Sequence, residues 1–135
     1  MSEMDNVIPI GVHITRFMND MGIDDFDDIG FLYQDYIFEC IDLVESISNM
    51  MLTAAPAEVE KLIHNFKGVS ANLYVDPVYS LLLVLDNYLL SHSLDQKTDQ
   101  EANDLWQEIK RTFARACIDI VAFFATNGVS LELNR

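Results

Sequence analysis

Apolar residues return every three or four positions along most of the chain, a spacing typical of helices that bury one face. This spacing predicts five helical segments, which cover residues 9–21, 28–52, 56–74, 76–91 and 98–126. Prolines at positions 9, 56 and 77 suit first helical turns, and Asn127-Gly128 suits the end of the last segment. We therefore expect an all-α fold.

The connections between the segments are short, which favours antiparallel neighbours. We expect an antiparallel up-down four-helix bundle over residues 25–127, with 9–21 as an additional N-terminal helix and 1–135 as a single domain. The chain has only five glycines and three prolines, too few for the tight turns of an all-β domain. Negative charge between Asp24 and Asp28 favours the N-terminus of the helix that follows.

The charge of the chain is strongly negative, because 22 Asp and Glu against 8 Lys and Arg give a net charge of −14. Nucleic acid and anionic membranes would repel such a chain, so neither is an expected partner. The N-terminus lacks the basic and apolar regions of a secretion signal, and no apolar run approaches the ~20 residues of a membrane-spanning helix. We expect a cytoplasmic protein, with access to the nucleus as well if the cell is eukaryotic.

The two cysteines, Cys40 and Cys117, lie 77 positions apart among apolar neighbours at helical spacing. This setting favours buried, reduced thiols over a disulfide or a zinc site. Pairing of Glu60 with His64 on one helical face would give only two ligands, so no metal is expected. His13 and His92 have no chemical companions in the sequence and are expected at the surface.

The third segment carries the candidate chemistry. Its core-facing residues centre on a direction about 160° from His64, at 100° per residue. They are Val59, Leu62, Ile63, Phe66, Val69, Ser70 and Leu73. His64 is therefore expected to point outward at mid-helix, whereas Ser70 is expected to be a small packing residue.

Positive charge and small side chains surround this histidine. Lys61 and Lys67 lie three residues on either side of His64 and are the only basic residues between Arg16 and Lys97. Two cations favour the neutral, nucleophilic imidazole and compensate negative charge that arrives on it, such as a phosphoryl group. Gly68 and Ala71 would leave the ring open to another protein. A helical glycine costs ~1 kcal/mol against alanine, which access to the ring would offset.

These residues match a known pattern: His-x-hydrophobic-Lys-Gly-x-Ser-x-x-hydrophobic, usually followed by glycine. The matching segment is His64-Asn65-Phe66-Lys67-Gly68-Val69-Ser70-Ala71-Asn72-Leu73. It resembles the signature of histidine-containing phosphotransfer (HPt) domains, which are four-helix bundles, often with an extra N-terminal helix in the stand-alone type. The resemblance covers residues 25–127.

The resemblance implies a role for each matching residue. His64 would be the phosphoacceptor, Lys67 the cation that orients or neutralises the phosphoryl group, and Gly68 the gap that admits a partner. The partners would be receiver domains of a hybrid histidine kinase and of a response regulator, which bring their own Mg²⁺. No nucleotide-binding motif is present, so we expect a phosphocarrier rather than an enzyme, with no cofactor of its own. The single exposed site favours a monomer.

The sequence departs from the pattern at Tyr74, which replaces the usual glycine and is expected to shade the ring. A partner-binding surface is predicted from Lys61, Ala71, Phe31, Gln34 and Phe38. Alternatively, Phe17 and Met18 of the first segment cover Phe31 and Phe38. The alternative function is a helical adaptor, a degenerate HPt domain that binds signalling partners without phosphoryl transfer and would tolerate His64→Gln.

Overall fold

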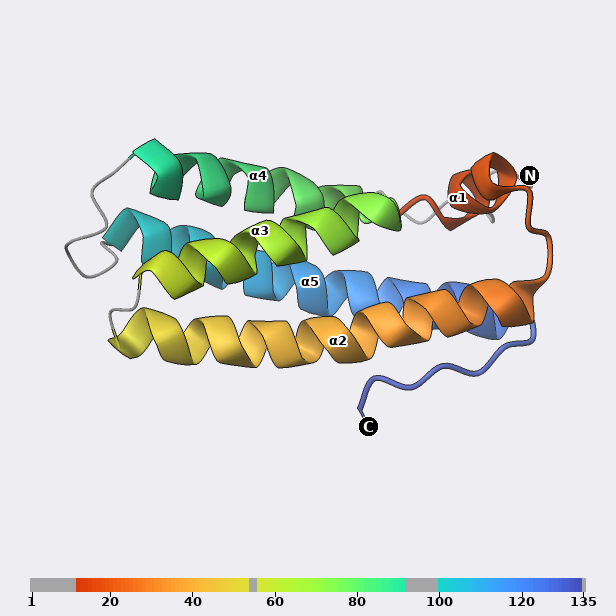
Figure 1. Ribbon diagram of the computed structural model, residues 1–135. Helices are drawn as coiled ribbons and strands as arrows, with labels where there is room; N and C mark the ends of the chain where they lie inside the picture. The colour runs from red at the N-terminus through yellow and green to blue at the C-terminus, as the bar shows by residue number, and fades with distance from the viewer. Residues whose placement is uncertain (1–11, 54–55, 92–99, 135) are drawn as a thin grey trace.

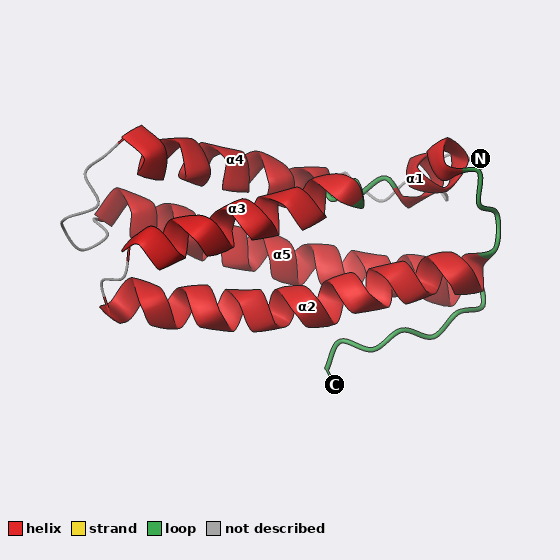
Figure 2. Ribbon diagram, in the orientation of Figure 1, coloured by secondary structure: helices red, strands yellow, loops and turns green. Residues whose placement is uncertain are grey.

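All the expected helices are present in the computed structural model, which describes residues 12–53, 56–91 and 100–134. They are α1 (Ile14–Met21), α2 (Phe26–Thr53), α3 (Pro56–Asn72), α4 (Asp76–Ser91) and α5 (Gln100–Thr126). The described residues contain no strand (Figure 2). An isolated bridge joins Val12 and Val75. The all-α expectation is confirmed.

The helix bounds differ most at the N-terminus. A helix was expected from residue 9, but α1 begins at Ile14. The expectation is wrong for Val12 and His13, because Val12 bridges Val75 and the His13 N–H donates to the Tyr74 carbonyl oxygen at 3.2 Å. Residues 9–11 and 98–99 lie outside the described part of the chain. The second helix begins two residues earlier than expected, where Asp25 Oδ1 accepts from the Asp27 N–H at 2.8 Å.

The four longer helices lie side by side with nearly parallel axes, and α1 lies across one end (Figure 1). Helix α3 packs between α2 and α4, while α5 contacts both α4 and α2. The enclosed core consists of the apolar stripes of these four helices, and α1 adds residues to it. Its largest members are Trp106, Tyr33, Phe66, Phe124, Ile14, Ile29, Ile37, Ile47, Ile63, Leu82, Leu85 and Ile109. This packing directs the opposite side of α3 toward solvent.

Polar contacts inside the core fix α3 against α2. The Tyr33 hydroxyl donates to the Leu73 carbonyl oxygen at 2.6 Å. The Tyr36 hydroxyl and Ser70 Oγ share a hydrogen bond of 2.8 Å. Ser70 is therefore a buried packing residue, as expected, and it also satisfies Tyr36. Burial raises the pKa of Tyr36 well above its ordinary value, so this phenol stays neutral.

Three helices end in the same way, with one residue in the left-handed conformation. These residues are Gly22 after α1, Tyr74 after α3 and Gly128 after α5, at φ of 72°, 60° and 83°. In each case the next residue donates its N–H back into the last helical turn, as Val75 does to the Ser70 carbonyl oxygen at 2.9 Å. The expected stop at Asn127-Gly128 is confirmed.

The segment after α5 folds back beside α2 (Figure 1). The side-chain amide of Gln34 binds both backbone polar groups of Glu132 in this segment. Gln34 Nε2 donates to the Glu132 carbonyl oxygen at 2.9 Å, and Gln34 Oε1 accepts from the Glu132 N–H at 2.7 Å. Gly30 makes room for this segment, since a Cβ there would lie 3.1 Å from Val129 Cγ1. We refer to residues 129–134 as the C-terminal strap.

Both cysteines are buried, free thiols, which confirms the expectation from sequence. Burial raises the pKa of Cys117 to about 12. It raises the pKa of Cys40 further, with the nearby Glu39 carboxylate as a second cause. Within the described ranges, no helix has both the length and the apolar composition needed to span a membrane.

Candidate functional site

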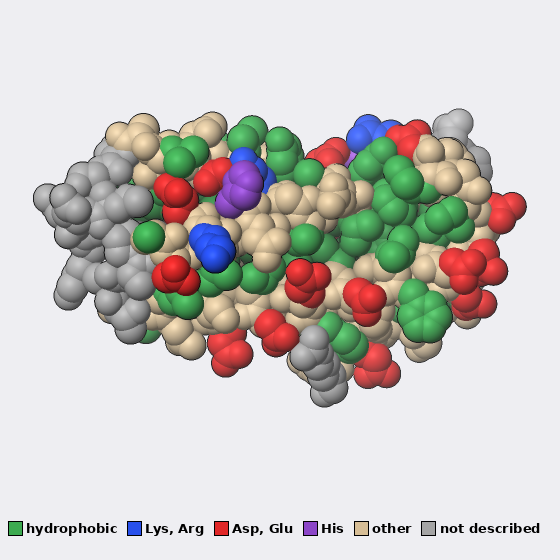
Figure 3. Space-filling view, in the orientation of Figure 1, with side chains coloured by type: hydrophobic (Ala, Val, Ile, Leu, Met, Phe, Trp, Pro, Cys, Tyr) green, Lys and Arg blue, Asp and Glu red, His purple; other side chains and the backbone are tan. Residues whose placement is uncertain are grey.

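His64 lies midway along α3 on the side that faces away from the core. Its side chain is 73% exposed. Figure 3 shows histidine and basic side chains adjoining over α3 and α4, with acidic side chains beside them and along α2. The outward position expected from the helical spacing is therefore confirmed. The core side of α3 is held by Ile63 and Phe66, which are fully buried.

A buried carboxylate from the neighbouring helix reaches this histidine. Asp86 of α4 has a side chain that is only 3% exposed. Its Oδ2 accepts a hydrogen bond from Lys67 Nζ at 2.6 Å and lies 3.5 Å from His64 Nδ1. Lys67 is itself mostly covered, with 18% of its side chain exposed. The three side chains form one cluster, which we call the His64 cluster.

Sequence reasoning missed Asp86, although a signal was present. Asp86 falls on the apolar stripe of α4, among residues that are almost completely buried. They are Val78, Leu82, Leu85 and Leu89. A carboxylate on such a stripe needs a cation or several hydrogen-bond donors, because burying it alone is costly. Lys67, which follows His64 by three residues, is the cation that pairs with Asp86.

This arrangement corrects the expected electrostatics. Two cations were expected to act on His64, but one of them, Lys67, forms an ion pair with Asp86. The pair is neutral as a unit, so Lys67 cannot repel a charged imidazole as a free cation would. Lys61 is exposed on the same helix. Its ammonium group is therefore at the surface, whereas that of Lys67 is paired with Asp86.

The small residues near His64 leave open space. A Cβ built on Gly68 would meet no other part of the described protein within 4 Å. Ala71, one turn further along α3, is also exposed. The fold therefore does not require glycine at position 68 for its own packing. Open space beside an exposed imidazole is what an approaching protein would need.

Tyr74 does not shade His64 as expected. Its hydroxyl donates to Asp20 Oδ2, its ring meets the edge of Phe17 at 5.5 Å, and Arg16 lies 4.8 Å from the ring centroid. All three contacts direct the side chain to α1. The backbone at Tyr74 is left-handed, a conformation that glycine adopts without steric cost.

The three residues predicted on α2 have different surroundings. Phe31 is 72% exposed, whereas Phe38 is partly buried and packs against the core. Gln34 is occupied by the strap. The alternative that α1 covers these phenylalanines does not hold for Phe31, and Phe17 of α1 packs on Tyr33 and Tyr74 instead.

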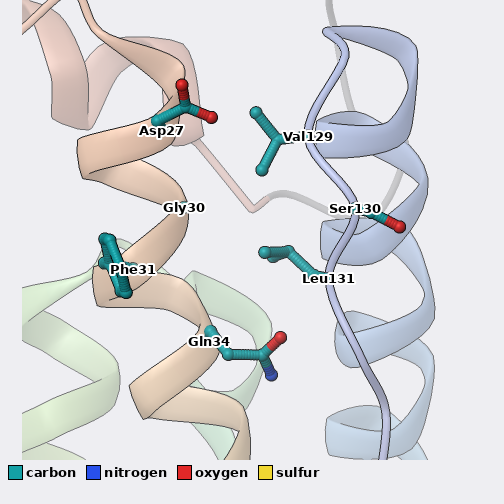
Figure 4. Close-up of a pocket in the computed structure, with 7 residues that line it drawn as sticks. All are labelled: Asp27, Gly30, Phe31, Gln34, Val129, Ser130 and Leu131. Atoms are coloured by element: carbon teal, nitrogen blue, oxygen red, sulfur yellow. The ribbon is translucent and has the colours of Figure 1, made fainter.

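A shallow hollow of about 340 Å³ lies between α2 and the strap (Figure 4). It is lined by Asp27, Gly30, Phe31, Gln34, Val129, Ser130 and Leu131. None of these residues belongs to α3, so the hollow is separate from the His64 cluster. Four of the five predicted partner-binding residues thus fall into two places: Lys61 and Ala71 on α3, and Phe31 and Gln34 at the hollow. The fifth, Phe38, packs against the core and does not line the hollow.

The remaining histidines are accounted for as follows. His13 is at the surface, as expected, but it has a companion that the sequence did not indicate: its Nε2 lies 3.5 Å from Asp76 Oδ2 at the start of α4. His92 lies outside the described residues. Among the residues that the structure describes, no three His, Cys, Asp or Glu side chains gather in a way that could hold a metal ion.

Comparison with known proteins gives no match to a family model, a curated protein or a solved structure. The chemistry of the His64 cluster is therefore judged from its own geometry.

Proposed function

We propose that this chain is a monomeric, cytoplasmic histidine phosphotransfer protein of a multistep two-component phosphorelay. His64 accepts a phosphoryl group from the phospho-aspartate of a receiver domain in a hybrid histidine kinase and passes it to a response regulator. The observation that carries the proposal is the exposed His64 imidazole at mid-helix, with Lys67 one turn away and open space at Gly68.

The arrangement of the helices supports this function. The four long helices enclose one core, and α1 is additional to them. We interpret this as an up-down four-helix bundle of the HPt type. In such a bundle α3 is a straight, rigid support, because its inner face is locked by buried Ile63, Phe66 and Ser70. A rigid support holds the acceptor nitrogen at a fixed place for in-line attack.

The chain and its partner would divide the chemical work. The receiver supplies the phospho-aspartate, Mg²⁺ and most of the transition-state stabilisation. The chain supplies a neutral imidazole nitrogen as nucleophile, and Lys67 as a cation near the transferred group. The N–P bond forms as the P–O bond to the aspartyl oxygen breaks, and that oxygen leaves with the electron pair. The same steps run in reverse toward the next receiver.

The surface around His64 suits a docked protein domain. Exposed Lys61, Gly68 and Ala71 line one side of α3, and Gly68 and Ala71 present no bulky group near the ring. Phe31 adds exposed aromatic area on α2. The rest of the chain is acidic, so a partner with a basic rim would be attracted to this face.

The test is phosphoryl transfer from a panel of receiver domains. The receivers are loaded with a small phosphodonor and Mg²⁺, mixed with the protein, and its intact mass is measured after acid and base treatment. We expect one acid-labile, base-stable phosphoryl group on the wild type and none on His64→Gln. His13→Gln is the matched control, because His13 also lies 3.5 Å from an aspartate oxygen.

A folded wild type that accepts no phosphoryl group from any receiver would contradict the proposal. Unchanged labelling of His64→Gln would also contradict it, because the group would then be elsewhere. If the folded wild type accepts no phosphoryl group but both the wild type and His64→Gln bind receivers, the adaptor function would be supported instead.

A further inference from the structure

The hollow between α2 and the C-terminal strap is a largely apolar recess with a carboxylate at one end (Figure 4). Its volume of about 340 Å³ lies at the lower end of the range for ligand sites. All of its lining residues belong to α2 or to the strap. We propose that the hollow is a docking site for an arginine side chain of a partner protein. This inference is independent of the chemistry at His64.

The middle of the hollow suits the stem of a long side chain. Gly30 leaves the α2 side open, because this position has no side chain. Figure 4 shows the side chains of Val129 and Leu131 pointing from the strap toward α2. The Gln34 amide lies at one end, but both of its polar atoms already bond Glu132. An occupant therefore meets apolar surface along most of its length.

Asp27 supplies the charged group, at the end of the hollow opposite Gln34 (Figure 4). Its carboxylate is not needed to cap α2, because Asp25 Oδ1 accepts from the N–H groups of Asp27 and Asp28, at 2.8 and 3.4 Å. Within the described ranges, no Lys or Arg side chain forms an ion pair with Asp27. This carboxylate can therefore pair with a cation from another protein.

The sequence around the hollow is acidic. Residues 24–39 contain six Asp and Glu and no Lys or Arg. The strap adds the exposed Glu132. A surface of this charge attracts cationic groups and repels anionic ones, so charge complementarity selects a positively charged occupant.

Phe31 favours arginine as that occupant. It follows Asp27 by one helical turn, so the two side chains are neighbours on α2, and its ring is 72% exposed. A guanidinium group can stack on an aromatic ring and bond a carboxylate through two parallel N–H groups. An ammonium group is more strongly hydrated and lacks this planar geometry. The arginine stem would lie over Gly30, with its head group at Asp27.

Titration of the full chain with capped tripeptides, followed by NMR, tests the inference. The three probes carry a central arginine, citrulline or norleucine between two alanines. Citrulline is a neutral isostere of arginine, and norleucine has an apolar chain without a head group. We expect the arginine probe to shift the backbone amide signals of Gly30, Phe31 and Ser130 but not that of Gly68. The other two probes should bind at least about fivefold more weakly.

Two substitutions separate the charge from the ring. Asp27→Asn and Phe31→Ala should each raise the Kd of the arginine probe by about two- to fivefold. Asp35→Asn is the matched control, because it makes the same charge change two turns from Asp27 at a position that does not line the hollow. It should change the Kd by less than about 1.5-fold. All three side chains are exposed, so the variants should keep the fold.

Several outcomes would overturn the inference. If no probe shifts the amide signals at the hollow, the hollow is not a docking site. Equal binding of the arginine and norleucine probes would mean that an apolar residue is the occupant. Equal weakening by Asp27→Asn and Asp35→Asn would mean that the attraction is diffuse. A wild-type dimer in sedimentation that Asp27→Asn dissociates would assign the hollow to a second copy of the chain.

These failures differ from failure of the proposed function, because none of the measurements involves phosphoryl transfer. His64→Gln should bind the arginine probe with the wild-type Kd, since the hollow contains no residue of α3. A wild type that binds the probe at the hollow but accepts no phosphoryl group would retain the docking site and remove the phosphotransfer function.

Discussion

At the scale of single residues, the side chain of Tyr74 stabilises the fold while its backbone conformation destabilises it. It occupies the left-handed position that ends α3, where glycine has no steric penalty. Its contacts with Asp20, Phe17 and Arg16 fasten α1 to the α3–α4 turn. These contacts offset the backbone cost, which is about 1 kcal/mol or more for a residue with a Cβ.

Two substitutions separate the backbone from the side chain. Tyr74→Ala and Tyr74→Gly both lose the contacts with α1, but only alanine keeps the backbone cost. We therefore expect Tyr74→Gly to be more stable than Tyr74→Ala by about 1 kcal/mol, measured by urea denaturation. Equal stabilities, or the reverse order, would show that the turn does not hold position 74 in the left-handed conformation.

At the scale of the helix, Gly68 weakens α3 without serving its packing. A helical glycine is about 1 kcal/mol less favourable than alanine or glutamine. Because a Cβ at position 68 meets no other part of the described protein within 4 Å, Gly68→Ala and Gly68→Gln should each stabilise the protein by up to about 1 kcal/mol. Thermal unfolding monitored by circular dichroism measures this gain.

The two Gly68 variants should differ in transfer from a receiver. The longer glutamine side chain projects into the space beside His64, so Gly68→Gln should slow transfer more than Gly68→Ala does. Destabilisation of both variants would mean that the glycine serves the fold. Equal transfer rates for the two variants and the wild type would mean that no partner approaches along this side of α3.

The C-terminal strap depends on one side chain of α2. Gln34→Ala removes both hydrogen bonds to Glu132, so the Glu132 amide should lose its protection from hydrogen exchange. The total free energy of unfolding should change by no more than about 1–3 kcal/mol. Asp35→Ala, at the exposed neighbouring position, is the control. Protection of the Glu132 amide that persists in Gln34→Ala would show that apolar contacts of the strap suffice.

At the scale of the whole molecule, buried acids with raised pKa values set an alkaline limit to stability. Burial raises the pKa of Cys117 from 9.0 to about 12. It also raises the pKa values of Cys40, Tyr33 and Tyr36. The unfolded chain loses these protons first as the pH rises. It therefore binds fewer protons than the folded chain, and the free energy of unfolding decreases.

The expected pH profile follows from that sign. The contribution of Cys117 is complete below pH 9.0 and is lost as the pH rises toward about 12. Within this window each such thiol lowers the free energy of unfolding by up to about 1.4 kcal/mol per pH unit. Urea denaturation at a series of pH values measures the decline. Cys117→Ala should decline less steeply above pH 9.0, and a slope identical to the wild type would contradict this account.

The helical spacing of apolar residues made the helices predictable from the sequence. The side-chain contacts between helices were not predictable in this way. The apolar stripes located all five helices, and the outward position of His64 followed from the same count. The partner of Lys67 did not follow, because pairing with Asp86 depends on how α4 rotates against α3. The hydrogen bonds between Gln34 and Glu132 join residues 98 positions apart, and no local sequence pattern indicates such a contact. The bridge of Val12 likewise replaced a helical turn that the local spacing favoured.

Trp106 gives the protein an intrinsic optical probe. It is the only tryptophan of the chain, and it is buried. Its indole N–H donates to Ser48 Oγ at 3.0 Å, and its ring meets Phe66, two residues from His64 on the inner side of α3. Its fluorescence should shift to longer wavelength when water enters the core. Phosphorylation of His64, on the outer side of the helix, should leave the emission unchanged, so unfolding and modification can be followed separately in one unlabelled sample.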